Sequence, residues 1–210
     1  MKFKSIRAEF DADIRNKYNV SVIAGSDEAG RGSLAGPLVV ASVILPVDYD
    51  NDEINDSKKI SISKRLSLFF EIKKIALAYC IKIYDNFFVE EHNPKLTSII
   101  GMKESLNELK VFPQIALIDG EKIELDEIEC VQLIKGDARS QTIGAASILA
   151  KVTRDQLMDE YAIVYPGYYF ESNKGYGTKL HLNAIKELGI LPIHRKTYEP
   201  IKSMLKKRKD

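Results

Sequence analysis

The sequence predicts an α/β fold, in which helices flank a sheet of mixed strand direction. Two β-branched, apolar runs over residues 20–24 and 38–45 are separated only by a glycine-rich turn, which is the pattern of an antiparallel pair. Further along the chain, apolar runs alternate with segments of helical periodicity, as in strands connected by helices. Paired strands followed by such alternation indicate a mixed sheet with helices on its faces.

Each element in the first half of the chain has its own local signal. Ser61 or Ser63 can accept hydrogen bonds from the first turn of a helix whose apolar residues recur at helical spacing. Asn93 and Pro94 form a cap and first-turn pair that opens a second helix. In order, we predict strands over 20–24 and 38–45, a polar loop over 48–57, a helix from Ser61 or Ser63 to Ala76, a strand over 79–84, a helix from 93 to before Pro113, and a strand over 114–118.

The second half contains a helix that we expect to pack closely against the sheet. A short apolar segment over 130–134 is followed by helical periodicity over 140–161, where Gly144 lies among alanines and a serine. A glycine inside a helix costs about 1 kcal/mol relative to alanine, so a close contact is the expected reason for it. A helix over 178–188 and a basic last helix follow. We therefore predict a domain over 1–162 with a short N-terminal extension and a small helical subdomain over 163–210.

The composition is that of a soluble globular protein, with 45% hydrophobic and 29% charged residues. No run approaches the roughly 18 apolar residues of a membrane helix, and the N-terminus lacks the apolar region of a secretory signal, so we expect no membrane contact and a cytoplasmic location. Cys80 and Cys130 lie in apolar stretches, which favours reduced, buried thiols. The net charge of +1 leaves any nucleic-acid binding to local patches, and nothing requires more than a monomer.

Four carboxylates follow predicted apolar runs at places where they could meet. Asp27 and Glu28 come after the first strand, Asp119 ends the strand over 114–118, and Asp137 follows the next apolar run. Sites in open α/β sheets gather outside the strand ends, so these acids are expected to converge. A carboxylate set without clustered His or Cys suits Mg²⁺ or Mn²⁺, and two such ions can activate water against a phosphodiester.

Simpler interpretations of these acids stay open on the sequence alone. An Asp-Glu pair at a strand end is more often a solvated turn than a site, and both carboxylates serve one centre only if the chain turns out of the strand there, as Gly30 and Gly32 would allow. Asp137 could instead act as the cap or first-turn acid of the helix that follows. Asp155 is a rival fourth ligand, although a surface ion pair beside Arg154 is the more ordinary role.

A set of longer motifs carries a family resemblance. The segments GSDEAGRGSLAGPLVVASVIL, DSKKIS, LIDG, KGDARSQTIGAASILAKVTRD, NKGYGT and HRKTYEP occur in this order between residues 20 and 200. Together they resemble ribonuclease HII, the bacterial type 2 ribonuclease H. The resemblance implies a ribonuclease H-like fold with a C-terminal helical extension, and an endonuclease that cuts on the 5′ side of a ribonucleotide in RNA/DNA hybrids and in duplex DNA, leaving 3′-hydroxyl and 5′-phosphate ends. The family's metal-binding acids map onto Asp27, Glu28, Asp119 and Asp137.

The same resemblance assigns substrate contacts. Gly30, Arg31 and Gly32 match the motif that senses the ribose 2′-hydroxyl, the group that distinguishes RNA from DNA at a site. Glycines let backbone groups approach a sugar closely, and arginine can hold the neighbouring phosphate with two hydrogen bonds. Tyr176 matches a tyrosine that stacks at the RNA–DNA junction. Positions that resemble the family's backbone contacts are Lys58, Lys59, Arg139 and Lys174.

Two positions depart from the family pattern. Ser33 stands where proline is usual, which is expected to loosen the sugar-sensing turn, and Asn173 stands where histidine is frequent. Neither belongs to the acid set.

Two other classes of function compete with this interpretation. A resolvase or transposase with a related core would use acids in the same way without needing the Gly-Arg-Gly segment or Tyr176. A silent binding module for RNA/DNA hybrids would gain nothing from four acids facing phosphates. A nucleotide-binding ATPase is disfavoured because the sequence contains no GxxxxGK[ST] loop.

Overall fold

The computed structural model describes residues 4–54 and 60–206, so the predicted contacts Lys58 and Lys59 lie outside the described residues. The chain divides into two compact units. The first comprises the chain up to Ala29, Val39–Lys82 and Ile99–Val152, and the second comprises Gly30–Leu38, Ile83–Ser98 and the chain from Thr153 onward. The predicted subdomain over 163–210 lies within the second unit, which also takes two segments from earlier in the sequence.

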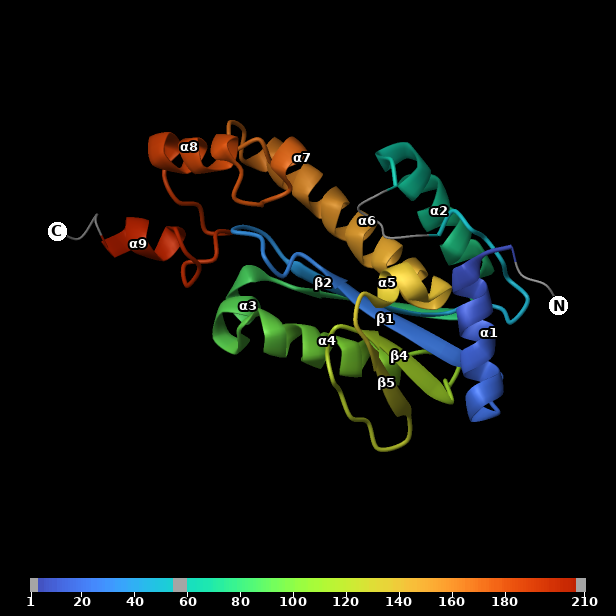
Figure 1. Cartoon of the computed structure of the whole chain (residues 1–210). Helices are drawn as coiled ribbons and strands as arrows, with labels where there is room; N and C mark the ends of the chain where they lie inside the picture. The colour runs from blue at the N-terminus through green and yellow to red at the C-terminus, as the bar shows by residue number, and fades with distance from the viewer. Residues whose placement is uncertain (1–3, 55–59, 207–210) are drawn as a thin grey trace. The chain divides into compact units, whose positions relative to one another are not determined.

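The five-stranded sheet has the mixed direction that the sequence predicts. Its strand order is β3-β2-β1-β4-β5 (Figure 1). Strand β1 pairs antiparallel with β2 and parallel with β4, and β4 pairs parallel with β5. The strands are β1 Ile23–Ala29, β2 Leu38–Ile44, β3 Ala78–Tyr84, β4 Ile115–Asp119 and β5 Glu129–Leu133.

Helices occupy most of the remaining described chain. The predicted helices correspond to α2, α4, α6, α8 and α9, while α1, α3, α5 and α7 have no counterpart among the predicted elements. None of the helices in the described residues is long and apolar enough to cross a membrane. The helices are α1 Ile6–Tyr18, α2 Ile62–Ile75, α3 Asn86–His92, α4 Pro94–Asn107, α5 Gly136–Arg139, α6 Gln141–Val164, α7 Phe170–Asn173, α8 Lys179–Leu188 and α9 Ile201–Lys206.

Helix α1 lacks a strong apolar stripe, which is why its periodicity gives no clear signal. It begins after Ser5, whose hydroxyl accepts from the backbone N–H of Arg7, and it ends at Asn19 in a left-handed conformation. Its buried face includes charged residues, Asp11 and Arg15. The Asp11 carboxylate accepts from the Thr142 backbone N–H at 2.8 Å, so it satisfies a free donor at the start of α6. Polar contacts therefore attach α1 to the first unit.

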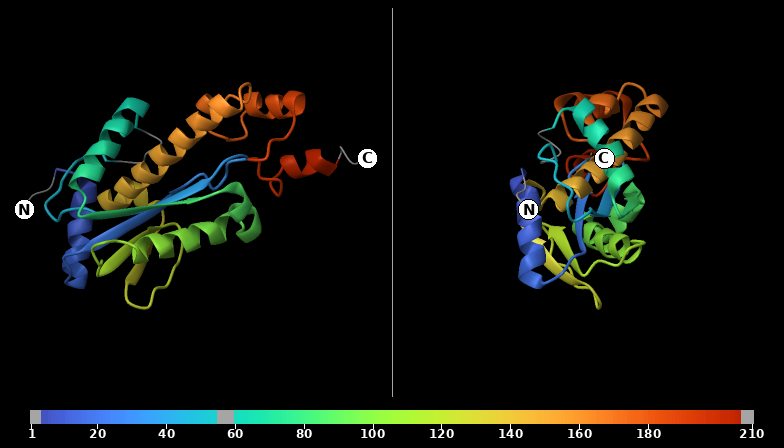
Figure 2. Two further views of the ribbon diagram at one scale, coloured as in Figure 1. Left: turned by 180° about the vertical axis from the view of Figure 1, so that it is seen from behind. Right: turned by 90° about the vertical axis from the view of Figure 1, so that its right-hand side faces the viewer.

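Helices cover both faces of the sheet in the first unit. On one face, a Cβ added at Gly25 of β1 would lie 2.5 Å from the backbone carbon of Thr142, so α6 approaches the strand as closely as glycine allows. This confirms the expected close packing of the small-residue helix. On the other face, the Ser42 hydroxyl of β2 bonds Ser105 of α4 at 2.7 Å. Figure 2 shows α4 running along this side of the strands.

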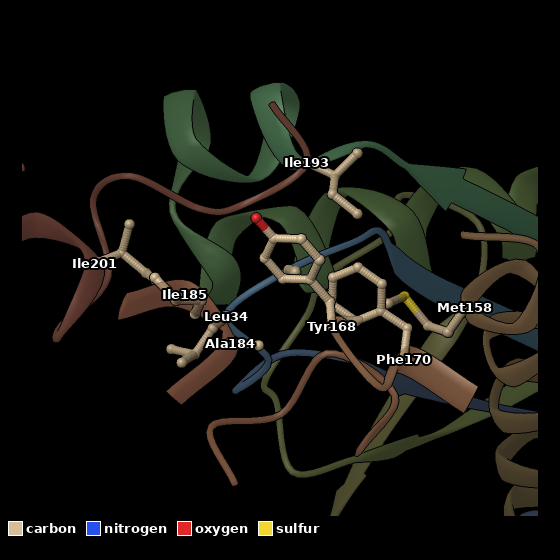
Figure 3. Packing of buried hydrophobic residues seen from close by; sticks show 9 residues of the cluster. Leu34, Met158, Tyr168, Phe170, Ala184, Ile185, Ile193 and Ile201 are labelled. Carbon is tan, nitrogen blue, oxygen red and sulfur yellow. The ribbon is translucent and has the colours of Figure 1, made fainter. Parts of the chain in front are cut away.

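The second unit has an apolar core of its own, in which aromatic rings are central. Tyr168 and Phe170 stack with their ring centroids 5.6 Å apart, and the Met158 side chain of α6 lies beside them (Figure 3). The Tyr168 hydroxyl donates to the Gly189 carbonyl at 2.8 Å, so its polar end is satisfied inside the core. The remaining buried members of this cluster are Leu34, Ala35, Ala184, Ile185, Ile193 and Ile201.

Candidate active site

Asp119 ends β4, and Asp27 lies two residues before the end of the neighbouring parallel strand β1. The register pairs Ser26 of β1 with Ile118 of β4, so the two acids are the next residues along their strands. Parallel strands end at the same edge of a sheet, and the two charges are close enough for Asp119 to raise the pKa of Asp27. The structure thus brings together two of the four predicted acids from positions far apart in the sequence.

Asp27 is a buried carboxylate with an unusually high affinity for a proton. Its side chain is 5% exposed. Its Oδ1 accepts from the Glu28 backbone N–H at 2.7 Å, and the Ser147 hydroxyl of α6 also donates to it. Burial raises the pKa of Asp27 well above its ordinary value, and the negative charges of Glu28 and Asp119 raise it further. A nearby cation would favour the ionised form.

Glu28 lies in a regular part of the strand. A turn out of the strand at the Asp-Glu pair would bring both carboxylates to one centre, but β1 continues through Ala29 and Glu28 pairs with Val40 of β2. The antiparallel ladder with β2 therefore extends past both acids. Side chains alternate along a strand, so Asp27 lies on the α6 face and Glu28 leaves the backbone toward the other face. Glu28 is partly exposed at this edge.

Asp119 also organises the turn that carries Asp137. The Gly136 backbone N–H donates to its Oδ1 at 2.5 Å, which fixes the start of α5. A Cβ at Gly136 would lie 2.5 Å from the end of the Ile143 side chain and 3.1 Å from Asp119 Oδ1, so the turn packs closely against both residues. Asp137 directly follows Gly136, so the hydrogen bond between Gly136 and Asp119 also fixes the backbone position of Asp137.

Asp137 does not cap the long helix that follows. Helix α6 begins at Gln141, where the Ser140 hydroxyl accepts from the Ile143 backbone N–H at 3.2 Å. Asp137 instead belongs to the separate four-residue helix α5, and its Oδ1 accepts from the next backbone N–H, that of Ala138. Asp137 is therefore not the cap of α6, but it is an acid in the first turn of α5, so the first-turn interpretation stays open. Asp155 lies on α6 in the second unit.

The acids do not form a closed ligand cage in this arrangement. Across residues 4–54 and 60–206, no three His, Cys, Asp or Glu side chains stand close enough to hold a metal ion. The donor set itself, carboxylates with one buried member, fits Mg²⁺ or Mn²⁺.

Arg139 contacts α1 rather than standing alone in solvent. Its guanidinium lies over the Phe10 ring at 5.1 Å from the ring centroid. The side chain is exposed, so its charge still reaches the surface next to α5. Sequence reasoning could not find this contact because α1 was not predicted.

The predicted substrate-contact residues Gly30, Arg31, Gly32, Lys174 and Tyr176 all belong to the second unit. Gly30 has a φ of +96° and is buried, whereas Gly32 is exposed. The Arg31 carbonyl accepts from the Tyr198 hydroxyl at 2.9 Å and from Arg195 at 3.0 Å. Lys174 pairs with Asp159, so its ammonium is engaged within the unit. The turn is thus anchored by the residues of HRKTYEP.

Asn173 anchors the loop that carries Tyr176. Its amide donates to the Tyr168 carbonyl at 2.7 Å and its Oδ1 accepts from the Gly175 backbone N–H at 2.8 Å. Tyr176 is 36% exposed, so part of the residue can be reached from solvent. The departure from histidine at position 173 therefore leaves a side chain with a defined structural role.

A buried histidine pair fixes the other side of the Tyr176 loop. The Leu191 backbone N–H donates to His194 Nδ1 at 2.8 Å, so His194 carries its proton on Nε2 and donates to His181 Nε2 at 3.0 Å. His181 Nδ1 then donates to the Tyr176 carbonyl at 2.9 Å. This chain of three bonds requires both rings to be neutral. Sequence reasoning missed the pair because thirteen residues separate its members.

We expect this pair to make the free energy of unfolding depend on pH. Burial lowers the pKa of His194 to about 4, and the pKa of His181 is also lowered by burial. Between pH 6.5 and 4 the unfolded chain binds a proton that the folded chain does not, so this contribution is present above pH 6.5 and is lost as the pH falls toward 4. The shift of His194 corresponds to roughly 3 kcal/mol.

Urea denaturation at pH 7 and at pH 4.5 tests this expectation. Replacing His194 by glutamine should remove part of the acid sensitivity of the wild type. His92→Gln changes the one histidine of the sequence outside this pair, and this variant should keep the full acid sensitivity of the wild type. Equal pH dependence in the wild type and His194→Gln would show that the neutral pair does not control stability.

Known proteins resemble this chain over nearly its whole length. The profile of the family described as Ribonuclease HII matches residues 24–200. The chain is 53% identical over 201 residues to a ribonuclease HII of Mycoplasma mycoides subsp. mycoides SC, covering 95% of this chain and 97% of that protein. It is 46% identical to one of Ligilactobacillus salivarius, covering 96% of this chain and 78% of that protein.

Solved structures agree with the fold. The crystal structure of ribonuclease H2 from Pyrococcus horikoshii OT3 superposes with a TM-score of 0.76 at 25% identity, covering 90% of this chain and all of that one. The ribonuclease HII in a complex with PCNA from Archaeoglobus fulgidus superposes with a TM-score of 0.68 at 27% identity, covering 85% of this chain and 95% of that one. The predicted ribonuclease H-like fold is confirmed.

Proposed function

The chain belongs to the ribonuclease HII family and is a ribonuclease H-type endonuclease, and we propose that it hydrolyses the phosphodiester bond on the 5′ side of a ribonucleotide. Its substrates would be RNA/DNA hybrids and duplex DNA with single embedded ribonucleotides, and the products would carry 3′-hydroxyl and 5′-phosphate ends. The observation that carries the proposal is the buried Asp27 carboxylate beside Asp119 at one sheet edge. The residues over 1–162 would cut, and those over 163–210 would help to bind the duplex.

Asp27, Glu28, Asp119 and Asp137 would bind two divalent ions, Mg²⁺ or Mn²⁺. The backbone of Glu28 directs its side chain toward the opposite face of β1, but its negative charge is near enough to raise the pKa of Asp27, which supports including it in the set. A ribonuclease HIII of the same fold was solved in complex with Mn²⁺. Such ions, when bound, supply a water of lowered pKa and stabilise negative charge on the leaving oxygen. Asp27 supports this role because burial makes its isolated charge unfavourable, while Asp119 places the turn of Asp137 through its bond to Gly136.

Recognition of the ribonucleotide would come from the second unit. The backbone of Gly30, Arg31 and Gly32 would contact the ribose 2′-hydroxyl, with Arg31 at the adjacent phosphate. Tyr176 would stack on the sugar or base at the junction with DNA. Lys58, Lys59, Arg139 and Lys174 would contact the backbone of the duplex.

A three-substrate cleavage assay tests this function. In Mg²⁺, the protein should cut a DNA duplex with one embedded ribonucleotide and a long RNA/DNA hybrid, and it should leave the all-DNA duplex intact. Cutting of all-DNA duplex at a similar rate would favour a resolvase-like or transposase-like activity instead. Binding of the hybrid without any cleavage would favour a silent binding module.

Tyr176→Ala should lower the cleavage rate at a single embedded ribonucleotide by about tenfold, because base–aromatic stacking contributes roughly 1–3 kcal/mol. Tyr169→Ala is the matched control, since Tyr169 is a tyrosine of the same unit with 44% of its surface exposed. It should not change the rate. An unchanged rate for Tyr176→Ala on this substrate would remove the stacking role from Tyr176.

A further inference from the structure

Arg154 is a fully buried arginine that joins the two segments proposed to sense the sugar. It lies on α6 with no exposed surface. Its Nε donates to the Pro37 carbonyl at 2.9 Å, and its NH2 group donates to the Ala35 carbonyl at 3.2 Å. Its NH1 group donates to the Lys174 carbonyl at 2.9 Å. One side chain therefore spans the Gly-Arg-Gly turn segment and the Tyr176 loop.

Ser33 completes this arrangement from inside the turn. Its hydroxyl donates to the Gly30 carbonyl at 2.8 Å and accepts from the Arg154 NH2 group at 2.8 Å. The Ser33 side chain is fully buried. The expectation that serine loosens the turn is not supported by these contacts, because the hydroxyl links Gly30 to a buried guanidinium.

The surrounding backbone leaves little freedom to either segment. A Cβ at Gly30 would lie 2.0 Å from Arg154 Nε, and Gly30 adopts a positive φ that other residues rarely take. The guanidinium also lies 5.3 Å from the centre of the Tyr176 ring. A guanidinium is planar and presents its donors in a fixed fork, so its bonds fix directions as well as distances. Displacement of Arg154 would therefore affect the turn and the tyrosine together.

We propose that Arg154, with Ser33 as its hydroxyl partner, is a positioning residue for ribonucleotide recognition. It holds the backbone of the Gly30–Gly32 turn and the Tyr176 ring in the arrangement that one ribose requires. This inference rests on the proposed function, and it adds two buried residues that do not themselves touch the substrate. Replacing either residue should therefore lower the cleavage rate on single ribonucleotides by more than the accompanying loss of folding stability explains.

The test compares Ser33→Ala and Arg154→Lys with the wild type on a duplex containing one ribonucleotide. Ser33→Ala should lower kcat about tenfold with a smaller change in KM, because sugar contacts near the reacting phosphate matter most in the transition state. Arg154→Lys should lower kcat at least as much, because lysine keeps the charge but lacks the planar fork. If Arg154→Lys does not fold, Ser33→Ala decides alone.

Ser105→Ala is the matched control. Ser105 is a buried serine of the first unit whose hydroxyl also makes two hydrogen bonds, to Ser42 and to the Met102 carbonyl. Loss of the Ser105 hydroxyl should lower the melting temperature about as much as Ser33→Ala does, but it should not change kcat. Equal kcat for Ser33→Ala and Ser105→Ala would overturn the positioning role, as would full activity of Arg154→Lys.

The cleavage activity of the wild type distinguishes a failure of this inference from a failure of the proposed function. If the wild type does not cut the embedded ribonucleotide in Mg²⁺, the proposed function is wrong and so is the inference that rests on it. If the wild type cuts and Ser33→Ala cuts equally well, only the positioning role is wrong.

Discussion

Asp119→Asn should lower metal-dependent cleavage of a single-ribonucleotide duplex by about a thousandfold or more while leaving the fold intact. The amide keeps an oxygen that can accept from the Gly136 backbone N–H, so the α5 turn should stay in place. The amide is neutral, so it binds a divalent ion much more weakly than the carboxylate does. Gel analysis of cleavage and circular dichroism of the same preparation measure the two effects separately.

Asp119→Ala is the companion variant, because alanine removes the acceptor as well as the charge. It should be equally inactive and should also melt at a lower temperature than Asp119→Asn, since the Gly136 N–H loses its partner. Retained cleavage by Asp119→Asn would remove this acid from the metal site. Equal melting temperatures for the two variants would show that the bond to Gly136 does not stabilise the turn.

Asp27→Asn should abolish cleavage and, in metal-free buffer at neutral pH, raise the melting temperature by several degrees. Burial and the charges of Glu28 and Asp119 raise the pKa of Asp27, so its ionised form destabilises the folded chain. The folded state binds more protons than the unfolded state above the ordinary pKa, so the stability of the wild type falls as the pH rises through this window. Asparagine has no charge to lose or gain, so the stability of Asp27→Asn should not fall with pH in this window. The difference between wild type and variant should vanish in acid below pH 3.8.

The divalent ion should reverse the order of stability at neutral pH. Ligand binding to the folded state alone stabilises it, so Mg²⁺ or Mn²⁺ should raise the melting temperature of the wild type but not that of Asp27→Asn. Asp48→Asn replaces an exposed acid and should match the wild type in every condition. A wild type that melts at the same temperature with and without divalent ion would contradict a metal role for Asp27.

The strands and the acids could be predicted because each has a local signal. Apolar runs mark β1, β2 and β4, and Asp119 stands at the very end of its strand. The proximity of Asp27 and Asp119 could be predicted from the rule that sites form outside strand ends. What the sequence could not show was that β1 continues past Glu28, because the length of the ladder depends on the partner strand.

The buried polar contacts could not be predicted from the sequence. Arg154 stands beside Asp155 in a helix, where an arginine is ordinarily a surface residue, and its partners lie more than one hundred positions away or in a separate loop. Asp11 of α1 is a similar case, since its partner is Thr142. Burial of such charges depends on long-range contacts that leave no periodic pattern in the sequence.

Cleavage of one defined substrate tests the central claim most directly. A DNA duplex with a single internal ribonucleotide is incubated with the wild type, with and without Mg²⁺ or Mn²⁺, and the product ends are mapped to the nucleotide. We expect one cut on the 5′ side of the ribonucleotide, with 3′-hydroxyl and 5′-phosphate ends, only when a divalent ion is present. Cleavage on the 3′ side, or cleavage that continues in excess chelator, would contradict the account.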